Sequence, residues 1–156
     1  GEDVTYSGTV SAAMEGALAG VRSIALSQMY KREGMGDHAP WEVAETWGEK
    51  VIRPLLDAPW SPRTLVNVNF PAIPPETVKG IRVVAQGLRD YGRSQIVKRT
   101  DPRGFNYYWF ALDEIVHTPA HSTDLEAIED GYVSVTPLHL DMTFAPALQV
   151  LAERYS

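Results

Sequence analysis

The sequence predicts an α/β fold with an antiparallel excursion. Helical and strand patterns alternate along most of the chain, and a long aromatic hairpin interrupts them near the middle. The chain has 156 residues, of which 44% are hydrophobic and 22% charged, as in ordinary folded domains. A single domain of this length is expected to bury roughly 70% of its extended-chain surface. We therefore expect one domain with a real core.

The first half of the chain predicts two helices and a strand. Apolar residues at helical spacing predict a helix over residues 8–20, which Gly20 is suited to end. Residues 21–27 follow as a short buried strand. Pro40 suits the start of the next helix, whereas Pro54 is expected to kink or end it, at a cost of ~3 kcal/mol in an interior. The expected buried positions are Val10, Ala13, Met14, Ala17, Leu18 and Val21, then Ala44, Trp47, Val51 and Leu55.

Two further segments read as strands. Residues 64–71, "TLVNVNFP", place apolar side chains on one face and Asn67 and Asn69 on the other. Such asparagines either line a site or hold a neighbouring loop through hydrogen bonds, and we favour the structural role. Residues 80–87, "GIRVVAQG", predict another strand.

The hairpin excursion covers about 89–112. Its expected arms are 95–99 and 105–112, joined by "DPRG" at 101–104, which has the type I turn signature. Basic residues and the run "FNYYWF" are typical either of single-strand nucleic-acid binding or of burial against a second subunit. The net charge of -6 argues against a nucleic-acid partner. We favour a homo-oligomer, with the basic residues attracting an anionic substrate.

The last elements are a helix, a strand and a closing helix. Thr123 and Glu126 form a capping box, and Gly131 is suited to end that helix. Residues 132–138 predict a strand, and residues 144–155 a helix.

Ser7, Gly8 and Thr9 are the candidate binding residues. They stand at the expected start of the first helix, where free N–H groups and a partial positive charge attract anions. Two interpretations stay open: these residues bind phosphate, or a hydroxyl only caps the helix. Asp3, just before them, either orients a metal ion's ligand or a water from behind, or only caps the helix and complements its dipole.

Other chemistries fit the sequence poorly. A nucleophile elbow requires glycine where Thr5 stands, so Ser7 is not expected to be a covalent nucleophile, and a P-loop ending is absent. His117 and His121 are four residues apart, but a proline between them spoils the helical geometry of a metal site. The sequence has no cysteine, which fits a reducing compartment, and no apolar run of roughly 18 residues. We expect a cytoplasmic protein without a membrane partner.

Several motifs resemble the SurE (survival protein E) nucleotidase family. The segment at 3–16 and the segment at 123–138 are the most specific, and the motifs follow the family's order across essentially the whole chain. They are "DVTYSGTVSAAMEG" at 3–16, "LVNVNFP" at 65–71, "KGIRV" at 79–83, "DPRG" at 101–104 and "TDLEAIEDGYVSVTPL" at 123–138.

The resemblance implies a metal-dependent phosphomonoesterase that hydrolyses nucleoside 5′- and 3′-monophosphates. It implies Mg²⁺ or Mn²⁺ as cofactor, and a Rossmann-like three-layer αβα fold with a protruding hairpin and a C-terminal element used in dimers or tetramers. Ser7, Gly8 and Thr9 match the segment that receives the phosphate in the family.

The family's metal ligands have no counterpart in residues 1–156. They are an Asp-Asp pair, a serine and an asparagine that precede the matched segment in the family. We therefore expect the chain to be the C-terminal portion of a single SurE-like domain, with the N-terminal metal-binding portion absent. On this hypothesis the isolated chain has no catalytic residue and is inactive. The alternative is a non-catalytic module for anion binding and oligomerisation.

Overall fold

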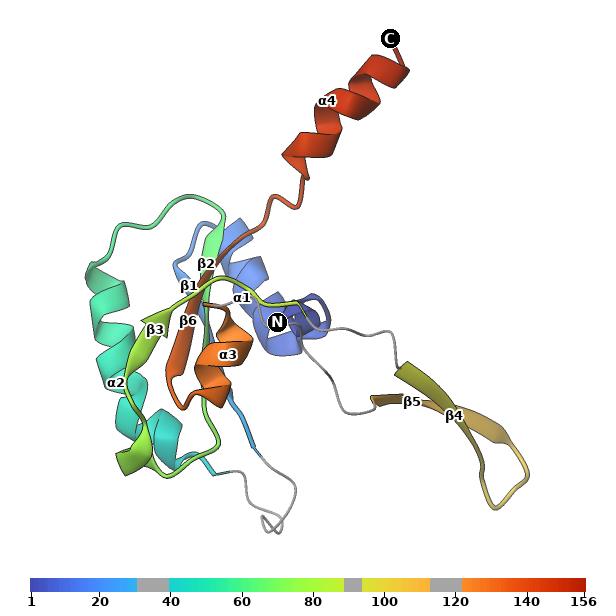
Figure 1. The fold of residues 1–156 in the computed structure, drawn as a ribbon, viewed down its shortest axis with the longest axis horizontal. Helices are drawn as coiled ribbons and strands as arrows, with labels where there is room; N and C mark the ends of the chain where they lie inside the picture. The colour runs from blue at the N-terminus through green and yellow to red at the C-terminus, as the bar shows by residue number, and fades with distance from the viewer. Residues whose placement is uncertain (31–39, 89–93, 113–121) are drawn as a thin grey trace.

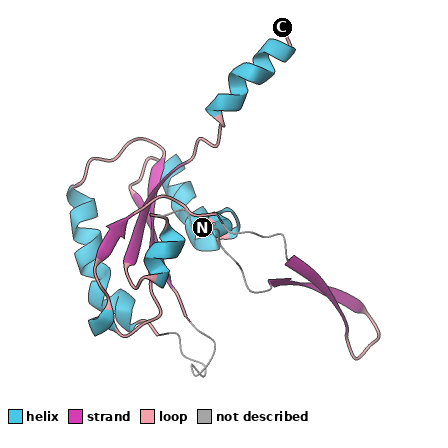
Figure 2. Cartoon of the chain, viewed as in Figure 1, coloured by secondary structure: helices cyan, strands magenta, loops and turns pink. Residues whose placement is uncertain are grey.

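The computed structural model of the chain describes residues 1–30, 40–88, 94–112 and 122–156. It has a four-stranded sheet with helices on both faces and a separate two-stranded hairpin (Figure 1, Figure 2). The predicted α/β fold is confirmed. The elements are η1 (Glu2–Tyr6), α1 (Gly8–Leu18), β1 (Ser23–Gln28), α2 (Glu42–Asp57), β2 (Thr64–Phe70), η2 (Pro75–Thr77), β3 (Ile81–Val83), β4 (Ser94–Thr100), β5 (Asn106–Leu112), α3 (Asp124–Glu129), β6 (Val133–His139) and α4 (Ala145–Arg154).

The sheet is mixed and has the strand order β1-β2-β6-β3. β1 runs parallel to β2, β2 antiparallel to β6, and β6 parallel to β3. β2 and β6 each have a neighbour on both sides, and most of their residues are buried. The strand predicted over 80–87 is regular only at Ile81–Val83, after which Ala85 forms an isolated bridge with Thr123.

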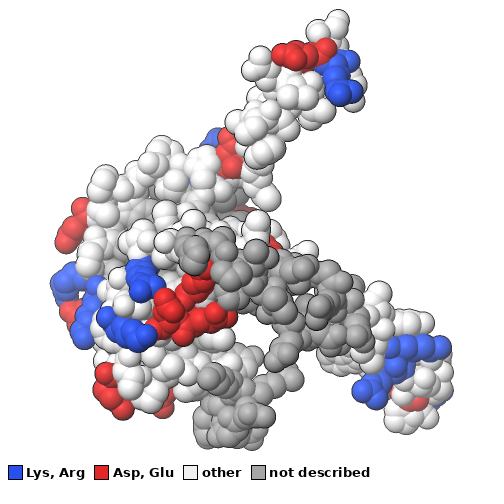
Figure 3. Space-filling view, viewed as in Figure 1, with Lys and Arg blue, Asp and Glu red and all other residues white. Residues whose placement is uncertain are grey.

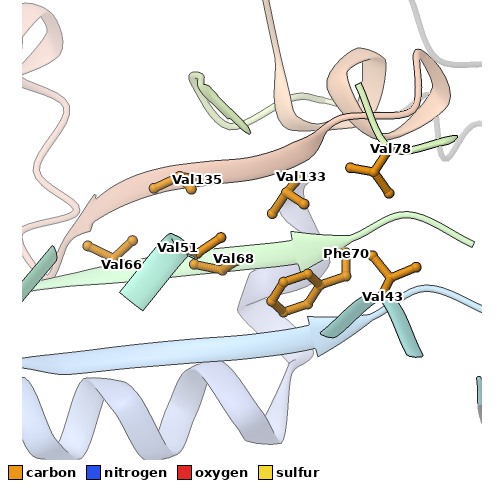
Figure 4. Close-up of a cluster of buried hydrophobic side chains, with 8 residues drawn as sticks. All are labelled: Val43, Val51, Val66, Val68, Phe70, Val78, Val133 and Val135. Atoms are coloured by element: carbon orange, nitrogen blue, oxygen red, sulfur yellow. The ribbon is translucent and has the colours of Figure 1, made fainter. Parts of the chain in front are cut away.

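The larger hydrophobic cluster lies on one face of the sheet under α2 (Figure 4). Alternate residues of β2 and β6 point to this face, as the two-residue period of a strand requires. Phe70 is the largest of them and is 1% exposed. The cluster consists of Val43, Val51, Val66, Val68, Phe70, Val78, Val133 and Val135.

The opposite face is covered by α1, which packs through Val10, Ala13 and Ala17 against β1 and β2. The prediction that Leu18 and Val21 continue this buried stripe is wrong, because each is 61% exposed. Gly20 adopts φ +77° and donates to the Ala17 carbonyl, while Val21 donates to the Gly16 carbonyl. This Schellman turn ends the helix, and the chain then enters β1 of the sheet at Ser23.

Two prolines behave differently from expectation in α2. The helix begins at Glu42, so Pro40 precedes its first turn, and it continues past Pro54 to Asp57. A proline so near the end removes one internal hydrogen bond and leaves few residues beyond it. The last carbonyls find other donors: Arg22 Nη1 lies 2.6 Å from the Leu56 oxygen, and Trp60 Nε1 lies 2.8 Å from the Leu55 oxygen.

The hairpin and α4 project from the sheet (Figure 1). β4 and β5 pair over the predicted arms, and a 3.0 Å hydrogen bond from Gly104 N to the Asp101 oxygen closes the predicted turn. α4 contains no buried residue. No helix in the described ranges is long and apolar enough to cross a membrane.

Candidate functional site

The start of α1 lies at the edge of the sheet where β1 and β2 end. At the other end of the helix, Ala17 and Gly20 line a cavity together with Thr64, the first residue of β2. The helix therefore runs antiparallel to the two parallel strands, and its first turn lies toward their carboxyl ends. In open α/β sheets ligands bind at this edge.

Ser7 is the N-cap of α1. Its Oγ accepts a hydrogen bond from Val10 N at 3.2 Å, and its carbonyl accepts from Ser11 N at 2.9 Å. The capping interpretation of this hydroxyl is therefore confirmed in geometry. A hydroxyl has two lone pairs and one hydrogen, so the cap leaves its O–H available to donate.

Gly8 and Thr9 form the open part of the helix start. Both are exposed, and a side-chain carbon on Gly8 would meet no atom within 4 Å other than its chain neighbours and the backbone of its own helix. Their N–H groups belong to the first turn, where the helix supplies no acceptor, and the helix dipole adds roughly half a positive charge. The structure thus brings three donors, two N–H groups and one Thr9 hydroxyl, to an accessible surface next to Ser7.

Asp3 lies in η1 and is half-buried. Ser7 caps α1, so the suggestion that Asp3 caps this helix is wrong. η1 itself is joined to α1 by a hydrogen bond from Ser7 N to the Val4 oxygen at 3.4 Å.

Asn67 and Asn69 lie on the α1 face of the sheet, opposite the apolar face, as predicted. Asn69 Nδ2 donates to Ser134 Oγ of the neighbouring strand at 3.3 Å, so its partner is a strand residue and not a loop. Among the described residues, Asn67 Oδ1 and Thr136 Oγ1 are buried without a hydrogen-bond partner. These two residues are register partners in β2 and β6.

A cavity of about 500 Å³ opens at the far end of α1 from Ser7. Arg22, Trp60 and Arg63 contribute to its wall. Because it adjoins the carboxyl end of α1 and the start of β2, it is separate from the candidate binding residues.

The described ranges do not supply a metal site. Within them, no group of three or more His, Asp or Glu side chains is arranged to hold an ion. His117 and His121 lie outside the described residues. His139 accepts a hydrogen bond from Asp141 N through Nδ1 at 3.0 Å, which is a local turn contact.

Sequence reasoning missed Asp124. It is 2% exposed, accepts a hydrogen bond from Gly87 N at 2.8 Å, and also pairs with the Gly1 nitrogen. The capping box that surrounds it was visible in the sequence and is confirmed. Its partners are 37 and 123 residues away, and no local pattern indicates contacts of that range.

The fold and the candidate site together define an α/β protein with an exposed helix start at the carboxyl edge of a mixed sheet. A model of the family described as Survival protein SurE matches residues 1–93. The chain belongs to the SurE family.

Curated relatives agree with this assignment. The "5'-nucleotidase SurE" of Rhizorhabdus wittichii is 67% identical over 99% of this chain, and that of Erythrobacter litoralis is 57% identical over 99%. The crystal structure of the SurE protein from Aquifex aeolicus has a TM-score of 0.77 and 38% identity over 100% of this chain. The chain spans 61% of the length of each of the two curated relatives and 60% of the Aquifex chain.

Proposed function

We propose that the protein carrying this chain is a metal-dependent phosphomonoesterase that hydrolyses nucleoside 5′-monophosphates, and 3′-monophosphates as well. The observation that carries the proposal is the 67% identity to a protein named 5'-nucleotidase SurE across 99% of the chain. The position of the α1 start at the carboxyl edge of the sheet supports it, because that edge is where this fold class binds ligands.

Ser7, Gly8 and Thr9 would hold the substrate's phosphate in this proposal. Their free N–H groups, the Thr9 hydroxyl and the helix dipole all favour an oxyanion. Gly8 leaves the approach to these N–H groups open. Ser7 has a hydroxyl already engaged in capping, which favours a holding role over nucleophilic attack.

The cofactor in this proposal is Mg²⁺ or Mn²⁺. No group of the described residues fits such an ion, and we derive no reaction step from it. From the family resemblance we propose that its ligands precede the segment that matches at residues 3–16. Residues 1–156 would then be the C-terminal portion of one SurE-like domain. The cytoplasmic location expected from the sequence stays a prediction.

Hydrolysis assays on two proteins test the proposal. We expect the 156-residue chain to release no phosphate from AMP or GMP, and a version extended upstream to the full length of its relatives to release it. A chelator should abolish the activity of the extended form, and added Mn²⁺ or Mg²⁺ should restore it. An extended form that leaves AMP and GMP intact would refute the nucleotidase assignment. Equal turnover by the short chain would refute only the assignment of the metal ligands to residues outside it.

A second candidate function is assembly without catalysis. The hairpin exposes Ile96, Tyr108 and Trp109 by more than 60% each, and its basic residues gather at the tip (Figure 3). α4 adds exposed Leu148 and Leu151. Ile96 lies opposite Phe110 in the hairpin, so Ile96 and Tyr108 belong to one face and Trp109 to the other. Exposed apolar side chains on both faces favour an interaction site, and a second copy of the chain is the partner that we propose. The rings of Tyr107 and Trp109 meet edge to face, with their centroids 6.3 Å apart. This contact orients both side chains before a partner binds.

The substitution Trp109→Ser tests this assembly surface. Wild-type chain should elute with a molar mass above that of one chain in size-exclusion chromatography with light scattering, and the variant should shift toward the monomer. Trp41→Ser is the matched control, because Trp41 is 56% exposed and Trp109 is 62% exposed. A wild-type monomer, or an equal shift in both variants, would contradict the hairpin's role.

A further inference from the structure

Asp124 is a buried carboxylate that joins three distant parts of the chain. It is the first residue of α3 and is 2% exposed. Oδ1 accepts from Gly87 N at 2.8 Å, and Oδ2 pairs with the nitrogen of Gly1. Burying a carboxylate is costly unless it is hydrogen-bonded or paired, so these contacts are the reason that the group can stay inside. The carboxylate therefore holds Gly1 and Gly87 at fixed positions.

The side of Asp124 that faces Gly87 is rigid. Asp124 N donates to the Ala85 oxygen at 2.9 Å, and Ala85 forms a bridge with Thr123. A side-chain carbon on Gly87 would lie 2.8 Å from Leu125 Cδ1, which shows how closely the segment after β3 approaches the start of α3. The capping box from Thr123 to Glu126 fixes the same turn from within α3. These contacts fix the position of Asp124 relative to Ala85 and Gly87.

The side that faces Gly1 leads to the candidate binding residues. Val4 N donates to the Gly1 oxygen at 3.3 Å, and Ser7 N donates to the Val4 oxygen at 3.4 Å. Ser7 then caps α1 through Val10 N. This series of hydrogen bonds connects the Asp124 carboxylate to the first turn of α1. No residue of η1 is fully buried, although Val4 packs partly against the α1 cluster.

We infer that Asp124 is a positioning residue for the phosphate site at Ser7–Thr9. The inference rests on the proposed function, because it assigns Asp124 to the same site. Asp124 does not touch the phosphate; it holds the segment that sets the position of the α1 start. The contact involves the terminal amine of the 156-residue chain. A peptide N–H at the same nitrogen would be a donor to the same oxygen.

Hydrogen exchange measured by mass spectrometry tests this role directly. In Asp124→Asn, and more strongly in Asp124→Ala, we expect a peptide covering residues 1–14 to exchange at least tenfold faster. Peptides from β2 and β6 should keep their wild-type exchange. Asp130→Asn is the matched control: Asp130 lies at the other end of the same helix, is exposed, and accepts from Arg82 Nη1 at 2.7 Å. That variant should leave residues 1–14 unchanged.

Calorimetric titration with inorganic phosphate supplies the second readout. Both Asp124 variants should bind phosphate at least fivefold more weakly than wild type, with Asp124→Asn the less affected because it keeps an acceptor oxygen. Exchange in residues 1–14 that is unchanged, or that rises no more than in β2 and β6, would overturn the positioning role. Wild-type chain that binds no phosphate would overturn the proposed phosphate site, while the exchange experiment would still decide whether Asp124 fixes the segment.

Discussion

Replacing Phe70 by alanine is expected to destabilise the chain by about 3–5 kcal/mol. Phe70 is 1% exposed at the end of β2 and packs in the cluster beneath α2 (Figure 4). Its removal forfeits the transfer free energy of the ring and leaves a cavity that the valines around it are too short to fill. Domains are stable by only about 5–15 kcal/mol, so the loss is a large share of the total. Urea unfolding at fixed protein concentration measures it as a lower midpoint with an unchanged slope.

Phe105→Ala is the control for this prediction. It is the same chemical change at a residue that is 71% exposed beside the hairpin turn. We expect it to alter the free energy of unfolding by no more than about 0.5 kcal/mol. Comparable losses in the two variants would mean that the cluster beneath α2 is not the main core of the fold.

The parts of the fold that the sequence predicted well are those with local causes. Gly20 and Gly131 both end helices with positive φ, at +77° and +85°, in the Schellman geometry that glycine favours. The turn at 101–104 closes as its Asp-Pro-x-Gly pattern predicts. In each case the chemistry of a few neighbouring residues determines the backbone, so no knowledge of the rest of the molecule is needed.

The errors arise where burial depends on a partner distant in the sequence. Leu18 and Val21 satisfy the helical period of α1, yet no described element covers them, and they stay exposed. The end of α2 depends in the same way on Arg22, 34 residues away, which donates to the Leu56 carbonyl. The hydrophobic period and the helix propensity of a segment describe that segment alone, so they do not predict contacts with other parts of the chain.

The candidate site also contains one residue that a local sequence pattern predicts and one that depends on distant contacts. Ser7 as a helix cap was predictable, since serine before an apolar helical pattern is a local signal. Asp124 was not, because its partners Gly1 and Gly87 are brought to it only by the folded chain. The candidate binding residues come from one turn of sequence, whereas the group that we assign to hold them in place lies more than one hundred residues away.

Gly8→Asp is expected to weaken phosphate binding more than tenfold while leaving the fold intact or slightly stabilised. A carboxylate about 5 Å from the phosphate costs about 3 kcal/mol at an effective dielectric constant of 20, and tenfold in affinity corresponds to about 1.4 kcal/mol. The same carboxylate in the first turn of α1 favours the helix dipole by about 0.3–1 kcal/mol. Calorimetric phosphate titration and urea unfolding should therefore move in opposite directions, which an unfolding artefact cannot produce.

Two control variants separate the site from bulk charge and from steric effects. Gly48→Asp makes the same change within α2, and as at Gly8 the added carbon would meet no atom within 4 Å beyond its chain neighbours and its own helix backbone. We expect it to leave phosphate affinity unchanged. Gly8→Ala adds bulk without charge and should weaken binding less than Gly8→Asp does. Equal losses of phosphate affinity in Gly8→Asp and Gly48→Asp would show that only the net charge of the chain matters. An unchanged phosphate affinity in Gly8→Asp would contradict the phosphate site, and Ser7 would then act only as a helix cap.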